Sequence, residues 1–331
     1  MAKSGRRRVV WILLLIVLII GALALTVAYS IGTNGPKLLD TVDSITGGSR
    51  DVELVHSHLL GEHPKQKLTV YRSANDAGEA GTKPVFLFVH GGGWRSGDID
   101  DYGFLARGLA PEGYVIVLAG YRLGADGAFP AMLEDTAKAV AWTKANIGEH
   151  GGDPETIFIS GHSAGAYNVA MLGLDRQWMG REGLDASDIA GVIGMSGPYD
   201  FYPFARDSTQ LAFGGASDPL ATQPVNQARA GAPPMLLVQG EKDTLVRPRN
   251  APLLAKAITD AGGKAVTAMF PDMAHNGPVL ALASPWRRNR ELIDRINAFT
   301  AEVLKERSAQ TADRSNESGI DASVPVQGET G

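Results

Sequence analysis

The feature of this sequence that most constrains the fold is a serine between two glycines at the end of an apolar run. Residues 156–160, Thr-Ile-Phe-Ile-Ser, lead directly into residues 161–165, Gly-His-Ser-Ala-Gly, with Ser163 at their centre. The apolar run predicts a buried strand. Glycines two residues before and after the serine predict a sharp turn into a helix, because larger side chains there would collide with the neighbouring backbone. Ser163 is therefore a candidate nucleophile.

Strand-like runs alternate with helical patterns along most of the chain. Eight runs are expected as strands, at 51–60, 67–73, 84–90, 113–121, 156–160, 190–196, 234–239 and 264–270. From the third run onward they alternate with expected helices near 100–111, 131–148, 164–174, 249–262 and 287–305. This alternation predicts an α/β fold with a doubly wound, mostly parallel, eight-stranded sheet.

A glycine-rich loop is expected directly after the third strand. The apolar residues 85–89 lead into residues 90–94, His-Gly-Gly-Gly-Trp. Consecutive glycines leave backbone N–H groups free to approach a ligand closely. Acyl transfer needs such fixed donors for the oxyanion of its transition state, so the amides of Gly92, Gly93 and Ala164 are the candidate oxyanion hole.

The base that would activate the serine is found by elimination among seven histidines. Six of them are expected elsewhere or pointing away. The first strands hold His56, His58 and His63, the glycine loop holds His90, and a helix ends at His150. His162 lies beside the serine and is expected to face away from it. His275 remains, on a loop just after the last expected strand. It is the candidate general base.

The acid that would orient this histidine is expected at the end of another strand. Asp243 follows the apolar run 234–239 and is the favoured candidate, with Glu241 and Asp200 as alternatives. The resulting chain order, serine, then aspartate, then histidine, is the order found in α/β-hydrolases.

These motifs resemble a known family. Besides the two glycine motifs, residues 121–123 (Tyr-Arg-Leu), 129–130 (Phe-Pro), 134–135 (Glu-Asp) and 152–154 (Gly-Asp-Pro) take part in the resemblance. The segment from about Lys83 to His275 resembles the α/β-hydrolase superfamily, in particular HGGG-type esterases such as the hormone-sensitive-lipase-like carboxylesterases and bacterial feruloyl or acetyl esterase-like proteins. The resemblance implies an α/β-hydrolase fold and a carboxylesterase that cleaves small or aryl carboxylic esters.

Two other functions remain open. The motif at residues 90–94 also resembles that of kynurenine formamidases, which cleave an N-formyl amide with the same kind of triad. A non-catalytic binding module is disfavoured, because all the expected catalytic positions hold competent residues. Aromatic residues of an expected lid insert, about 198–232, would line an apolar pocket or pack a small core of their own: Tyr199, Phe201, Tyr202, Phe204 and Phe213. Arg206 or Arg247 could bind an acidic substrate.

Composition narrows the partners and cofactors. The 31 Lys and Arg against 36 Asp and Glu give a net charge of −5, which offers no overall basic field for nucleic acid. Cysteine is absent, so disulfides, thiolate metal sites and a cysteine nucleophile are excluded. No HExxH pattern, paired histidine ligands or phosphate loop occurs, and we expect neither a metal nor another cofactor. The expected partner is a small-molecule ester.

The N-terminal segment predicts a membrane anchor. Twenty uncharged residues run from Val9 to Ala28, directly after the basic residues of segment 1–8. Twenty apolar residues span a bilayer core of about 30 Å, and the basic end stays cytoplasmic. We therefore expect a single-pass anchor at 9–29 in the cell membrane, with the catalytic domain on the outer, periplasmic side. A cleaved signal peptide is the alternative, and Arg6 and Arg7 match a twin-arginine signal only loosely.

The remaining divisions of the chain follow from composition. Residues 30–50, with several glycines and a proline, are expected as a linker, and 51–306 as the catalytic domain. Residues 307–331 are rich in small and polar residues and are expected to be disordered. The sequence leaves the oligomeric state open.

Overall fold

The computed structural model describes residues 11, 13, 15, 18, 35–47, 51–76 and 83–320, the last eight of these as helical backbone only. Except for four single residues, the predicted anchor at 9–29 therefore lies outside the described residues. Within the described residues, no helix combines the length and apolar character needed to cross a membrane.

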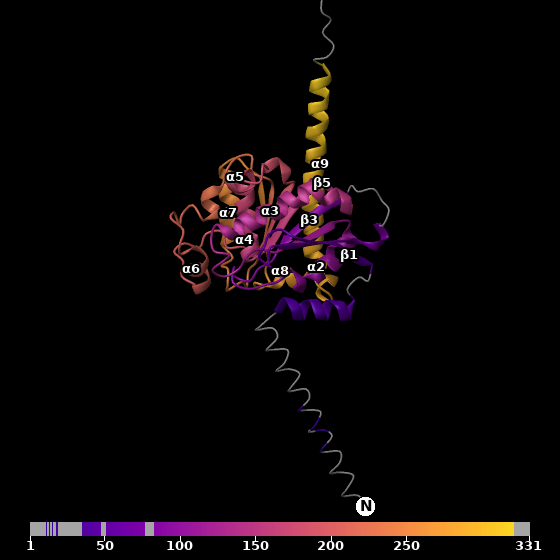
Figure 1. The fold of residues 1–331 in the computed structure, drawn as a ribbon, viewed down its shortest axis with the longest axis vertical. Coiled ribbons are helices and arrows are strands. Elements are labelled where there is room, and N and C mark those ends of the chain that lie inside the picture. Colours follow the sequence, from indigo (N-terminus) through magenta and orange to yellow (C-terminus); the bar gives the residue numbers. More distant parts are fainter. Residues whose placement is uncertain are drawn as a thin grey trace, which may run out of the picture.

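One eight-stranded sheet organises the domain, as the sequence predicts (Figure 1). Its strands are β1 (Val52–Leu59), β2 (Lys67–Ser73), β3 (Lys83–Val89), β4 (Val115–Ala119), β5 (Gly152–His162), β6 (Gly191–Met195), β7 (Met235–Gly240) and β8 (Ala265–Phe270). Their spatial order is β1-β2-β4-β3-β5-β6-β7-β8. The β1–β2 and β2–β4 pairs are antiparallel, and all the others are parallel. The strands from β3 onward therefore end at one edge of the sheet.

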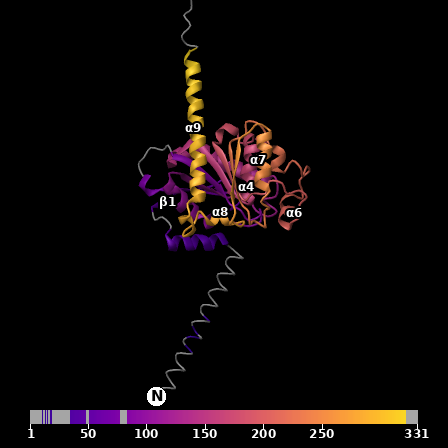
Figure 2. The ribbon, with the colours of Figure 1, turned by 180° about the vertical axis from the view of Figure 1, so that it is seen from behind.

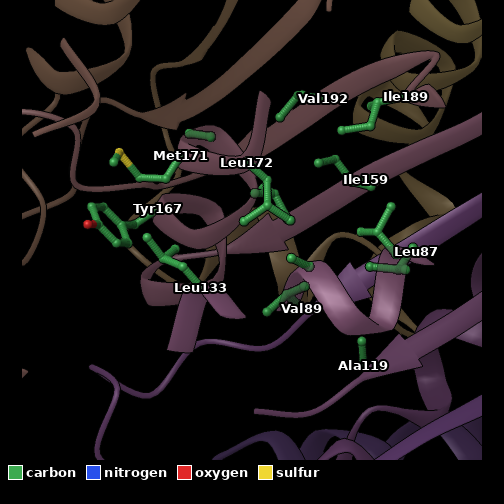
Figure 3. Packing of buried hydrophobic residues seen from close by; sticks show 14 of the residues in the cluster. Leu87, Val89, Ala119, Leu133, Ile159, Tyr167, Met171, Leu172, Ile189 and Val192 are labelled. Carbon is green, nitrogen blue, oxygen red and sulfur yellow. The ribbon is translucent and has the colours of Figure 1, made fainter. Parts of the chain in front are cut away.

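The central strands are apolar throughout because both faces of the sheet are covered. Val85, Leu87 and Val89 point into one core, and Phe86 and Phe88 into the other. Alternating side chains of a strand leave on opposite faces, so a strand buried on both sides must be continuously apolar. Figure 3 shows the first core, in which strand residues such as Leu87 and Ile159 pack against helix residues such as Leu172.

Helices form a layer on each face of the sheet. Residues of α3, α4, α5 and α7 belong to the first core, and those of α2, α8 and α9 to the second. The helices are α2 (Gly103–Leu109), α3 (Ala131–Asn146), α4 (Ala164–Leu174), α5 (Arg176–Gly180), α6 (Asp207–Phe213), α7 (Asn250–Asp260), α8 (Gly277–Leu280) and α9 (Glu291–Ile320). This is the doubly wound arrangement that the alternating pattern predicts.

The predicted linker contains a helix that docks onto the domain. Residues 35–46 are helical, and the views from both sides show them lying across one end of the domain near α8 (Figures 1 and 2). Leu39 is buried in the second core and the Asp43 side chain is fully buried. Asp43 accepts hydrogen bonds from Arg107 Nε at 2.6 Å, Arg287 Nη1 at 2.7 Å and the amide of Ser284 at 2.6 Å. The segment expected as a linker thus contains a helix, which partners far away in the sequence stabilise.

Replacing Asp43 with asparagine should destabilise the domain by about 3 kcal/mol, because two partly buried guanidinium groups would lose their shared carboxylate. Urea unfolding monitored by circular dichroism measures this loss. Asp40→Asn is the matched control. Asp40 lies on the same helix as Asp43 and also pairs with Arg107, but its side chain is partly exposed. We expect its cost to stay below about 1 kcal/mol. Equal losses in the two variants would contradict the assignment of Asp43 as the main attachment.

The C-terminal tail also differs from the prediction. Helix α9 continues to Ile320, and both views show its distal part extending away from the domain, at the end opposite helix 35–46 (Figures 1 and 2). Residues 307–320, expected as disordered, are therefore helical. Six of these fourteen residues are alanine, glutamate, glutamine or arginine, which have high helix propensity. Residues 321–331 lie outside the described part.

Candidate active site

Ser163 stands on a sharp turn between β5 and α4. Its φ of 53° and ψ of −118° are unusual for a residue other than glycine. A Cβ on Gly161 would lie 2.4 Å from the carbonyl carbon of Gly165, and one on Gly165 would lie 2.1 Å from the carbonyl oxygen of Val89. Close backbone packing therefore requires both glycines. This is the collision with the neighbouring backbone that the sequence predicts for larger side chains.

The structure brings the three predicted catalytic side chains into one hydrogen-bonded chain. His275 Nε2 lies 3.0 Å from Ser163 Oγ, and His275 Nδ1 lies 2.8 Å from Asp243 Oδ2. A carboxylate can only accept, so Nδ1 carries a proton and Nε2 of the neutral ring is free to accept one from the serine. This arrangement can convert a hydroxyl group into a nucleophile.

Asp243 is held as a carboxylate by its own turn. Its Oδ1 accepts hydrogen bonds from the amides of Leu245 and Val246, both at 2.8 Å, and Gln239 Nε2 donates to its Oδ2 at 3.0 Å. Burial acts to raise the pKa of the Asp243 carboxyl, but hydrogen bonds from His275 and the two amides outweigh burial and hold the pKa below its ordinary value. The group is therefore ionised at neutral pH.

The two alternative acids lie elsewhere. Asp200 pairs with Arg249 at 3.2 Å, and Glu241 is exposed at the start of the turn after β7. Neither forms a hydrogen bond with His275 among the contacts of the described residues.

The glycine loop after β3 has a backbone that requires glycine. Gly92 and Gly93 have positive φ values of 114° and 60°, and a Cβ on Gly92 would lie 1.8 Å from the carbonyl oxygen of Ser96. The amides of Gly92, Gly93 and Ala164 donate no hydrogen bond to any other group in the described part of the chain. These three residues line the same cavity as Ser163, and three such amides can bind an oxyanion.

Buried polar contacts support this loop. Trp94, which also has a positive φ of 57°, donates from Nε1 to Asn168 Oδ1 at 3.1 Å, and Asn168 donates to Thr136 Oγ1 at 3.2 Å. Tyr121 donates from its hydroxyl group to the carbonyl oxygen of His90 at 3.1 Å. The loop is therefore fixed from α3, α4 and the segment after β4, so its amides are oriented before a ligand arrives.

His162 does not face away from the site, contrary to the prediction. Its Nε2 donates to the carbonyl oxygen of His275 at 3.0 Å, and the two rings lie 5.0 Å apart. Burial and the neighbouring His275 lower the pKa of His162 to about 3, so its ring is neutral. His162 therefore links the turn that carries Ser163 to the loop that carries His275. The sequence shows its position but not that the 271–277 loop folds over it.

A cavity of about 1640 Å³ opens at Ser163. It is lined by Ser163, His275 and the glycine loop, and by residues of the lid insert such as Phe201 and Tyr202. Phe213 is instead buried in the core, where its ring lies 4.8 Å from that of Trp94 and 5.2 Å from that of Phe201. The aromatic residues of the insert therefore fill both expected roles: some line the cavity and others pack into a core.

Charged residues line the cavity from several segments: Lys37, Lys65, Asp98, Asp100, Asp101, Asp200, Arg206, Arg247 and Arg249. Arg206 and Arg247, the candidate anion-binding residues, both line the cavity and are exposed. Arg206 donates to the carbonyl oxygen of Leu245 at 3.1 Å. Over the described residues, no three His, Cys, Asp or Glu side chains form a group that could hold a metal ion.

Comparisons with known proteins give a family match and several relatives. The BD-FAE family model matches residues 68–258. Esterase LipC of Mycobacterium tuberculosis is 32% identical over 232 residues, which are 61% of this chain and 55% of that protein. The isoprenylcysteine alpha-carbonyl methylesterase ICME of Arabidopsis thaliana is 26% identical over 269 residues, 72% of this chain and 60% of that protein. The chain thus spans between half and three fifths of the length of these curated relatives.

The fold also matches solved structures. Esterase B from Lactobacillus rhamnosis superposes with a TM-score of 0.72 at 18% sequence identity, over 88% of this chain and 98% of the other. At this level of identity the likeness shows a shared fold.

Proposed function

Because the chain belongs to the BD-FAE family of α/β-hydrolase esterases, we propose that it is a serine carboxylesterase that cleaves small or aryl carboxylic esters through an acyl-enzyme on Ser163. The observation that carries the proposal is the hydrogen-bonded chain from Ser163 through His275 to Asp243. The names of the relatives, which are esterases, support the same reaction class.

The first half of the reaction forms a covalent intermediate. Ser163 Oγ attacks the ester carbonyl carbon while His275 Nε2 takes the hydroxyl proton, and the carbonyl oxygen becomes an oxyanion. The amides of Gly92, Gly93 and Ala164 bind that oxyanion. The intermediate collapses, the bond from carbon to the alcohol oxygen breaks, and His275 returns the proton to the leaving alcohol.

The second half repeats the same steps with water. His275 removes a proton from a water molecule, whose oxygen attacks the acyl carbon, and the acid leaves as Ser163 Oγ regains a proton. Asp243 stabilises the imidazolium form of His275 in both halves and holds the ring in the correct tautomer.

The location in the cell is part of the proposal. The uncharged segment 9–28, with basic residues before it, would anchor the protein in the cell membrane with the domain on the outer side.

Removing residues 1–30 should then give a soluble protein that retains its activity on short esters, since the described domain and helix 35–46 remain intact. Sedimentation with membranes and turnover of p-nitrophenyl butyrate by both forms measure this. A protein expressed from the full sequence but found in the soluble fraction without its N-terminal segment would argue for a cleaved signal peptide instead.

Substrate turnover tests the reaction class. We expect the residue 31–331 protein to cleave p-nitrophenyl acetate and butyrate, and not N-formylkynurenine. Cleavage of the formamide alone would favour an amidase, and a well-folded protein inactive on all three substrates would favour a binding module.

A further inference from the structure

Helix 35–46 forms part of the wall of the active-site cavity. Gly35, Pro36, Lys37, Leu38, Leu39 and Val42 line the cavity that also contains Ser163 and His275. The helix is a fixed wall, because the buried Asp43 joins it to Arg107 and Arg287. A segment expected as a linker therefore contributes directly to the space in which substrate would bind.

The same helix places the cavity close to the predicted anchor. Only the five residues 30–34 separate Tyr29, at the end of the apolar segment, from Gly35. An extended chain covers at most about 3.6 Å per residue, so this connection reaches roughly 20 Å. If residues 9–29 cross the membrane, the cavity wall lies within that distance of the bilayer surface.

The cavity lining combines charged residues with an apolar part, and the apolar part suits a membrane surface. Large apolar residues on it come from four separate segments and include several with exposed side chains: Leu38, Val42, Tyr202, Leu245, Leu280 and Trp286. Trp286 is 47% exposed, Leu245 48% and Tyr202 46%. Tryptophan and tyrosine are typical of membrane–water interfaces. The cavity, about 1640 Å³, also exceeds the roughly 300–1000 Å³ of most ligand pockets.

We infer that this cavity takes membrane-embedded, amphiphilic carboxylic esters with a long apolar chain, which enter along helix 35–46. This inference rests on the proposed esterase activity and membrane location, and it adds the substrate class. The short connection keeps the cavity at the bilayer surface, and the apolar residues of helix 35–46 and of the segment 279–286 accept the chain as it leaves the lipid.

Lengthening the connection tests this inference. The full chain is reconstituted in phosphatidylcholine vesicles that contain p-nitrophenyl palmitate, and p-nitrophenyl butyrate is supplied in solution. One variant carries twenty Gly/Ser residues inserted between Ser30 and Ile31. The matched control carries the same insertion between Gln327 and Gly328. The insertion lengthens the connection about fivefold. The effective concentration of the cavity at the bilayer surface falls with the −3/2 power of that length, which is a decrease of roughly elevenfold.

We expect palmitate turnover to fall on the order of tenfold in the first variant and to stay unchanged in the control, with butyrate turnover equal in all three proteins. Equal palmitate rates in the two insertion variants would overturn the inference. So would a full-length protein that cleaves butyrate but not vesicle-bound palmitate. Failure to cleave butyrate would instead reject the proposed esterase activity itself.

Discussion

Ser163→Ala should lower ester turnover on the order of 10⁶-fold while leaving the domain folded. The substitution removes the only atom that can form the acyl-enzyme in the proposed reaction, and losses of about this size follow removal of a serine nucleophile in other triad enzymes. The backbone should keep its conformation, because alanine fits wherever serine does. Initial rates with p-nitrophenyl butyrate and a thermal unfolding curve measure the two effects.

An exposed serine outside the site provides the control. Ser57 lies on β1 with its side chain exposed, so Ser57→Ala should retain full activity. A phosphonate ester reagent adds an independent readout, since we expect one covalent label on the wild-type chain and on Ser57→Ala, and none on Ser163→Ala. Labelling or substantial turnover in Ser163→Ala would show that another group is the nucleophile.

The sheet could be predicted because each central strand is buried on both faces. Continuous apolar runs such as 85–89 then stand out from the amphipathic helices between them, and all eight strands lie where the sequence predicts. The main difference is the start of β5, since Gly152 already pairs with Lys83 of β3. The Gly-Asp-Pro sequence at 152–154 is typical of a turn, and the pairing partner decides its conformation.

The candidate site could be predicted because its chemistry is encoded in local motifs. Ser163, the glycine loop and Asp243 each follow an apolar strand, and parallel strands bring such ends to one edge of the sheet. His275 lies after the last strand and needed only elimination among the histidines. The distances of 3.0 Å and 2.8 Å that join the three side chains are consequences of the topology.

The parts that were missed depend on contacts between distant residues. Helix 35–46 is stabilised by Arg107 and Arg287, which no local pattern connects to Asp43. A short helix with a proline near its start resembles a connector until its partners are known. The role of His162 depends in the same way on a carbonyl group 113 residues further along the chain.

Asp243→Asn should lower kcat by up to about 10⁴-fold, which is the loss known for the corresponding change in a serine protease. The new side-chain amide could still accept hydrogen bonds from the backbone of Leu245 and Val246, but its NH₂ group would face His275 Nδ1 and donate to it. The ring would then carry its proton on Nε2 and could not accept one from Ser163. Steady-state kinetics with p-nitrophenyl butyrate measure the loss.

Asp200→Asn is the matched control for this substitution, since Asp200 lines the same cavity and pairs with Arg249. We expect the variant to retain kcat within about threefold, because a solvent-exposed ion pair is worth at most about 1 kcal/mol and this one does not contact His275. The two variants together decide which carboxylate orients the base. A large loss of kcat in Asp200→Asn with a small one in Asp243→Asn would reverse the assignment.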